Sequence, residues 1–132
     1  MSVVVGYVNT NEGEAALTAS VEEARRRDTR LVVVLARKSG GDDHAVLDAE
    51  ADAVRDVLDQ ADIAYDVRQL RRSDDVADSL VTTAEEVDAD LIVIGLRRRS
   101  PVGKLILGSN AQKILLDAPC PVLAVKPRSA AA

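Results

Sequence analysis

Residues 91–118 read LIVIGLRRRSPVGKLILGSNAQKILLDA, and their pattern is the key to interpreting the rest of the chain. The first part, 91–96, is an unbroken apolar run, which is typical of a strand covered on both faces. The last part begins at Gly108-Ser109 and carries apolar residues at helical spacing, namely Ala111, Ile114, Leu115 and Ala118. A buried strand that leads through a loop into an amphipathic helix indicates a strand–helix–strand crossover, and therefore a parallel sheet.

The same alternation extends over the whole chain. Four further apolar runs predict strands at residues 3–8, 31–36, 63–70 and 121–125. The run 63–70 alternates with charged residues, which favours an edge position. Between the strands lie three more helical stripes, formed by Leu17, Val21 and Ala24, by Leu47, Ala51, Val54, Leu58 and Ala61, and by Val76, Leu80, Ala84 and Val87.

Polar residues mark the expected starts of three helices. These residues are Asn11 with Glu14 three positions on, Ser73-Asp74, and Ser109. Each type accepts hydrogen bonds from the backbone N–H groups of a first helical turn. A turn at residues 40–43 precedes the second helix, and we expect His44, the only histidine, to be a solvated loop residue.

These elements predict one α/β domain over residues 1–132, in which 127–132 form a frayed tail. The expected architecture is Rossmann-like, with a five-stranded, mostly parallel sheet of order 3-2-1-4-5 and helices on both faces. Such a sheet binds ligands beyond the carboxyl ends of its strands, where the strand order reverses. The expected site therefore lies between the loops at residues 7–13 and 95–109.

Composition excludes several classes of protein. The chain has 132 residues, a net charge of −5 and one cysteine, Cys120, which we expect to be a small buried hydrophobe. One cysteine rules out an internal disulfide, and no apolar run approaches the ~18 residues of a membrane span. The acidic balance argues against general binding to nucleic acid or membrane surfaces. Because no basic leader region precedes the first strand, we expect a cytoplasmic protein.

The charge is unevenly distributed. Residues 91–116 contain no acid and carry a charge of +5, which leaves −10 for the remainder of the chain. Within this window, Gly95 and Gly108-Ser109 would let backbone N–H groups approach an anion without interference from a Cβ atom. Together these features describe a phosphate cradle. Glycine at a strand end and serine at a helix start are also common structural choices, and neither the Walker lysine motif nor Gly-x-Gly-x-x-Gly is present.

The chain resembles the universal stress protein A family over essentially its whole length. The resemblance lies in the alternation of elements and in the ending GSNAQKILLDAPCPVLAV, residues 108–125. ATP-binding members of that family carry Gly, two residues, Gly, nine residues, then Gly-Ser or Gly-Thr. Here Gly95 and Gly108-Ser109 match, whereas Arg98 stands at the second glycine. The resemblance implies an adenine nucleotide alpha-hydrolase-like fold and a stress-response protein that binds ATP or another adenine nucleotide, together with Mg²⁺.

A second departure lies at the end of the first strand. Family members usually carry an Asp there that contacts the ribose, and the matching position is Val8, so either Asn9 replaces that contact or it is absent. The main chain near Ala36 and Ile94 would flank the adenine. The nucleotide-binding residues that the resemblance implies are Gly6, Val8, Asn9, Ala36, Ile94, Gly95, Arg97, Arg98, Gly108, Ser109 and Asn110.

Arg98 leaves two alternatives open. Its side chain either folds over the phosphates and binds them, or fills the ribose space and closes the pocket. The first alternative is a nucleotide-binding regulatory protein, and the second is a dimeric interaction module of the same family without a nucleotide. An enzyme is a weaker third interpretation. No catalytic residue is expected, and any ATP hydrolysis should be slow, because the loop contains no general base.

The last expected strand, 121–125, is apolar and would lie at the sheet edge. An exposed apolar edge is a template for pairing, and two copies related by a two-fold axis would cover it. The resemblance implies the same homodimer, since universal stress proteins commonly dimerise through this strand. The expected partners are therefore a nucleotide and a second copy of the chain, and neither nucleic acid nor a membrane.

Overall fold

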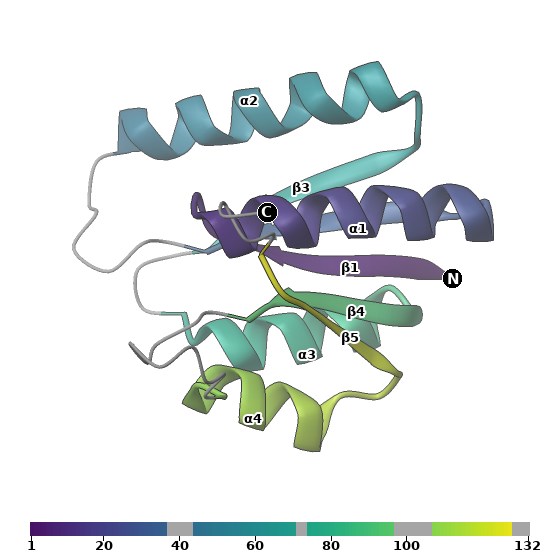
Figure 1. The fold of residues 1–132 in the computed structure, drawn as a ribbon, viewed down its shortest axis with the longest axis vertical. Coiled ribbons are helices and arrows are strands. Elements are labelled where there is room, and N and C mark those ends of the chain that lie inside the picture. The colour runs from purple at the N-terminus through teal and green to yellow at the C-terminus, as the bar shows by residue number, and fades with distance from the viewer. Residues whose placement is uncertain (37–43, 71–73, 97–106, 128–132) are drawn as a thin grey trace.

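The computed structural model describes residues 1–36, 44–70, 74–96 and 107–127, with the backbone alone for 44–47. A single sheet of five strands lies between two pairs of helices (Figure 1). The strands are β1 (Ser2–Tyr7), β2 (Arg30–Leu35), β3 (Tyr65–Gln69), β4 (Ala89–Gly95) and β5 (Val122–Val125). The helices are α1 (Asn11–Arg27), α2 (His44–Ala61), α3 (Val76–Glu86) and α4 (Ser109–Asp117).

The strand order is β3-β2-β1-β4-β5, and all four pairings are parallel. This confirms the predicted fold class and order. β1 lies at the centre, and the chain leaves it towards β2 on one side and later returns to β4 on the other. The strand order therefore reverses between β1 and β4, where the register pairs Val5 with Val93.

The core has two layers, one on each face of the sheet. Val3 and Val5 point to the face covered by α1 and α2, whereas Val4 points to the face covered by α3 and α4. This alternation follows from the two-residue period of a strand. All three side chains are fully buried. The central strands are therefore apolar on both faces, and their β-branched residues suit such positions.

The expected helix starts need correction. The N-cap of α1 is Thr10, whose hydroxyl accepts a hydrogen bond from the Gly13 amide at 3.2 Å, and Asn11 is already helical. Asp75 caps α3, and Gly108, not Ser109, is the N-cap of α4. Helix α2 begins at His44, so this residue belongs to a helix backbone and not to a loop. For α1, α3 and α4, the cap lies within two residues of the predicted position.

Element ends also differ from the predicted ranges. β3 and β5 begin two and one residues later than expected, at Tyr65 and Val122. Leu115, assigned to the buried stripe of α4, is 44% exposed, and Cys120 is only half-buried. Of the expected tail at 127–132, all but Pro127 lies outside the described residues. No helix in the described ranges is long and apolar enough to cross a membrane.

Candidate functional site

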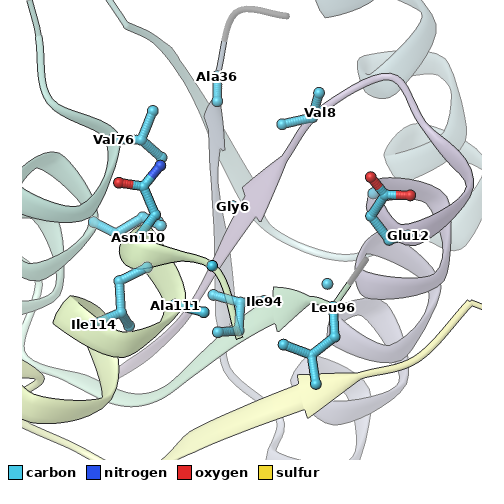
Figure 2. Close-up of a pocket in the computed structure, with 14 residues that line it drawn as sticks. Gly6, Val8, Glu12, Ala36, Val76, Ile94, Leu96, Asn110, Ala111 and Ile114 are labelled. Carbon is cyan, nitrogen blue, oxygen red and sulfur yellow. The ribbon is translucent and has the colours of Figure 1, made fainter. Parts of the chain in front are cut away.

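A cavity of about 180 Å³ opens where β1 and β4 end, at the point where the strand order reverses. The first residues of α1 and α4 approach it from two sides, and α3 closes it from one face of the sheet (Figure 2). Its lining residues are Gly6, Val8, Glu12, Gly13, Ala36, Val76, Leu80, Ile94, Gly95, Leu96, Gly108, Asn110, Ala111 and Ile114. This is the position at which doubly wound sheets bind their ligands.

The wall on the α3 and α4 side is apolar. Leu80, Ile94 and Ile114 line the cavity and are almost fully buried in the second core layer. Gly6 lies at the centre of the view in Figure 2. A Cβ atom at this position would come within 2.9 Å of the Leu80 Cδ1 atom. The missing side chain therefore keeps the cavity open above β1.

Two glycines bring the start of α1 against the strand ends. A Cβ atom at Gly13 would collide with the main-chain carbonyl oxygen of Val8, and one at Gly95 with that of Glu12. Both obstacles are backbone atoms, which cannot turn aside as a flexible side chain can. Gly95 is therefore required for packing, whatever it contributes to ligand binding. The first turn of α1 lies close over the end of β4 for the same reason.

The N-terminus of α4 forms the opposite side. Gly108, Asn110 and Ala111 line the cavity, and the first amides of a helix have no partner within it. This geometry suits an anion, because the exposed N–H groups and the helix dipole both favour negative charge. The Gln112 side chain donates a hydrogen bond of 3.0 Å to the Leu107 carbonyl, which fixes the chain as it enters the helix.

Helix α4 is also tied to α3. The Lys113 ammonium group lies 2.7 Å from Asp78 and 3.8 Å from Asp75, both in the first turn region of α3. The hydrogen bond to Asp78 raises the pKa of Lys113. These groups are partly exposed, so the contact orients the helix more than it stabilises the fold.

A hydrogen bond between Tyr7 and Glu14 links β1 to the first turn of α1. The Tyr7 hydroxyl donates a hydrogen bond of 2.8 Å to Glu14 in the first turn. Burial of the ring, and then the hydrogen bond and the negative charge of Glu14, raise the pKa of Tyr7. Glu14 thus binds a side chain from the preceding strand and does not take part in a capping box with Asn11.

Seven of the eleven predicted site residues line this cavity: Gly6, Val8, Ala36, Ile94, Gly95, Gly108 and Asn110. Asn9 and Ser109 are exposed and do not belong to the lining. Arg97 and Arg98 lie outside the described residues. The structure therefore gathers most of the predicted set, while their contact with a ligand stays a prediction.

Seven other lining residues were not among those predicted: Glu12, Gly13, Val76, Leu80, Leu96, Ala111 and Ile114. Glu12 and Gly13 fall inside the loop at residues 7–13 that the strand reversal had marked. The α3 and α4 residues belong to apolar stripes, which indicate burial but not which end of a helix borders a cavity. For these the sequence carried no separate signal.

A second, more open hollow of about 500 Å³ lies between the end of β3 and α3. Three aspartates line it, Asp74, Asp75 and Asp78, and Lys113 pairs with the latter two. In the described part of the chain, no group of three or more His, Cys, Asp or Glu residues is arranged to hold a metal ion. Burial, aided by Asp90, raises the pKa of the Cys120 thiol, which disfavours the reactive thiolate.

The parallel strand order and the helices on both faces place the protein in the class of doubly wound α/β domains, and its cavity lies at the strand reversal. Residues 1–126 match the model of the Universal stress protein family, and the chain belongs to this family. A universal stress protein from Mycolicibacterium smegmatis is 45% identical over 131 residues, which cover 95% of this chain and 97% of that protein.

Solved structures agree with this assignment. A universal stress protein from Archaeoglobus fulgidus superposes with a TM-score of 0.78 at 34% identity, covering 96% of this chain and 98% of the other. A universal stress protein from the same organism in complex with dAMP superposes with a TM-score of 0.74 at 29% identity, with the same two coverages. The resemblance deduced from the sequence is thus confirmed at the level of family and fold.

Proposed function

We propose that this chain is a regulatory protein that binds an adenine nucleotide in the cavity between the β1–α1 and β4–α4 connections. The observation that carries the proposal is the cavity itself, which joins an apolar wall to the open N-terminus of α4 at the strand reversal. A nucleobase needs a flat apolar surface, and a phosphate needs N–H donors. In this site the apolar wall lies beside the N-terminus of α4.

The parts of a nucleotide can be assigned to parts of the site. We place the adenine near Ala36 and Ile94, where β2 and β4 end and the lining is apolar. The phosphates lie at Gly108, Ser109 and Asn110, at the start of α4. Arg97 and Arg98, which lie outside the described residues, follow Leu96 in the sequence, and we propose them as additional positive charge for the phosphates. The related protein from Archaeoglobus fulgidus that was solved with dAMP supports an adenine nucleotide as the ligand.

ATP with Mg²⁺ is the ligand that we favour, because the basic window at residues 91–116 offers more charge than a single phosphate requires. We infer a regulatory role in the cytoplasm, in which the bound and the empty protein differ in their affinity for a partner. Hydrolysis should be slow at most. Glu12 is the one titratable side chain in the described lining, and its carboxylate would have to approach negatively charged phosphates in order to act as a base.

Two measurements test nucleotide binding. Freshly purified protein is denatured, and the supernatant is examined by mass spectrometry for a released nucleotide. Separately, AMP, ADP and ATP with Mg²⁺ are titrated into the protein by calorimetry. Gly108→Val places a bulky side chain at the N-cap of α4 and should abolish the binding heat. Asp117→Val, at the exposed end of the same helix, should leave it intact.

Neither released nucleotide nor binding heat with any of the three nucleotides would refute the proposal. The result would favour the interaction module without a nucleotide instead. A loss of binding in both valine variants would also count against the assignment, because Asp117 lies outside the cavity lining.

The edge strand β5 is the proposed surface for a second copy of the chain. It pairs with β4 on one side, and it is the last strand of the sheet. Leu123 and Ala124 are both exposed, which is unusual for an apolar strand and suggests that a partner covers them. Antiparallel pairing of two such strands about a two-fold axis would bury them.

Analytical ultracentrifugation tests the homodimer. The wild-type chain should sediment as a dimer at micromolar concentration, and Leu123→Asp should sediment as a monomer. Val57→Asp places the same charge on an exposed position of α2, and should leave the dimer intact. A monomeric wild type would refute this assembly.

A further inference from the structure

Helix α4 is anchored in the core by one side chain. Over its nine residues, all of which the structure describes, Ile114 is the one that is buried, whereas α3 has four buried residues. Its N-cap, Gly108, makes no side-chain hydrogen bond, although α1 and α3 both begin with such a bond. A helix anchored at a single position can still turn about its own axis. Other contacts must therefore fix the direction in which its first amides face.

Helices α3 and α4 border the cavity together. They pack side by side on one face of the sheet (Figure 1). Val76 in the first turn of α3 and Asn110 in the first turn of α4 both line the cavity, and Figure 2 shows them on the same side of Gly6. The rotation of α4 against the start of α3 therefore decides how the N-terminus of α4 faces a ligand.

The Lys113 side chain joins α4 to the start of α3. Its ammonium group lies 2.7 Å from the Asp78 carboxylate and 3.8 Å from that of Asp75. The Asp75 carboxylate is itself held in place, because it accepts a hydrogen bond of 2.9 Å from the Asp78 backbone N–H. Lys113 directly precedes Ile114 and points about 100° away from it around the helix axis. Two anchors in different directions fix the rotation of a helix, which one alone does not.

From these contacts we infer that Lys113 is a positioning residue for the phosphates of the bound nucleotide. Its ion pairs with Asp78 and Asp75 hold α4 in the rotation that turns its first N–H groups towards the cavity. The inference rests on the proposed adenine-nucleotide site and adds the residue that orients its anion-binding end. The ion pairs can favour this orientation by no more than their own free energy, so their loss should weaken binding about three- to five-fold.

A direct effect of charge is the rival explanation, and it predicts a different sign at one position. Lys113 carries a positive charge, so its removal weakens the binding of an anion in either case. Asp78 carries a negative charge, and its removal would strengthen the binding of a phosphate if charge alone mattered. If the ion pair positions α4, removal of Asp78 weakens binding instead. Asp78→Ala therefore separates the two explanations.

The test measures affinity by calorimetry, with whichever of AMP, ADP and ATP with Mg²⁺ the wild-type chain binds most tightly. Lys113→Met should weaken binding about three- to five-fold. Asp78→Ala should weaken it too. The double variant should bind about as weakly as Lys113→Met alone, because both substitutions remove the same contact. Circular dichroism establishes that each variant is folded.

Two further variants serve as controls. Lys113→Arg keeps the positive charge and should bind within about two-fold of the wild type. Arg55→Met removes a cation from an ion pair with Asp52 on α2, far from the cavity lining. The Arg55 side chain is 44% exposed and that of Lys113 is 42% exposed, so the two pairs are closely matched. Arg55→Met should leave the affinity unchanged.

Wild-type affinity in Lys113→Met, or tighter binding by Asp78→Ala, would refute the positioning role and leave the nucleotide site standing. Losses that add up in the double variant would also refute it, because the two side chains would then act independently. If the wild-type chain binds no AMP, ADP or ATP, the proposed function fails, and this inference fails with it.

Discussion

The main-chain carbonyl of Glu12 occupies the space in which a side chain at Gly95 would lie. The end of β4 and the first turn of α1 therefore meet through backbone atoms. This contact closes one side of the cavity at the strand reversal. It also gives the glycine at the start of the family motif a structural role that is separate from any contact with phosphate.

Gly95→Ala should destabilise the fold by about 1–3 kcal/mol, because the new methyl group meets backbone and one of the two elements must shift. Gly6→Ala is the matched control. The nearest atoms to its methyl group belong to the Leu80 side chain and not to backbone, so a smaller loss is expected. Urea denaturation followed by circular dichroism compares the two. A larger loss for Gly6→Ala would show that the space between Gly6 and Leu80 accommodates a methyl group less well than the contact between Gly95 and α1 does.

The sequence identified the right end of the sheet but only part of the site. Gly95 and Gly108 could be predicted because glycines at a strand end and before a helix stand out in the chain. Leu80 could not, because its place in an apolar stripe shows that it is buried and not that it borders a cavity. The parallel topology puts the N-terminal end of α3 at the carboxyl edge of the sheet, but how close Leu80 comes to β1 is set by long-range packing.

Thr10→Ala should cost about 1 kcal/mol, because the Thr10 hydroxyl caps the Gly13 amide and alanine leaves that donor without its partner. Asn11→Ala should change the free energy of unfolding much less, because Asn11 is an exposed residue of the first turn. Urea denaturation of both variants measures the difference. Equal losses, or a larger loss for Asn11, would favour the cap first expected from the sequence.

The strands and the layers of the core were more predictable than the helix starts. Val3, Val4 and Val5 form an apolar run that is typical of a strand covered on both faces. A cap, in contrast, depends on a single hydrogen bond, and Thr10 and Asn11 are both good capping residues in adjacent positions. The choice follows from where β1 ends and how closely Gly13 approaches Val8, which requires the three-dimensional structure.

Ile114→Ala should destabilise the protein by about 2–5 kcal/mol, because Ile114 is 2% exposed and joins α4 to the core beside the cavity. Leu116→Ala lies in the same helix, at a side chain that is 84% exposed, and should stay within about 0.5 kcal/mol of the wild type in the monomer. Thermal and urea denaturation at low protein concentration compare the two. A large effect of Leu116→Ala would mean that the exposed side of α4 contacts another molecule.

The hydrogen bond from Tyr7 to Glu14 predicts how stability depends on alkaline pH. Burial and Glu14 raise the pKa of Tyr7 above its ordinary value of about 10. Between these two pKa values the unfolded chain loses the Tyr7 proton and the folded chain keeps it, so the unfolded state binds fewer protons. The free energy of unfolding should therefore fall as the pH rises above about 10.

Tyr7→Phe should remove this contribution and make the decline between about pH 9.5 and 11 shallower. Urea denaturation at closely spaced pH values measures the slope. Tyr65→Phe is the control. Its hydrogen bond to Asp59 raises the Tyr65 pKa too, but the pair is exposed, so the slope should change less. If the free energy of unfolding falls equally steeply with pH in the wild type and in Tyr7→Phe, Tyr7 ionises in the folded protein. The Tyr7 hydroxyl would then be readily reached by solvent.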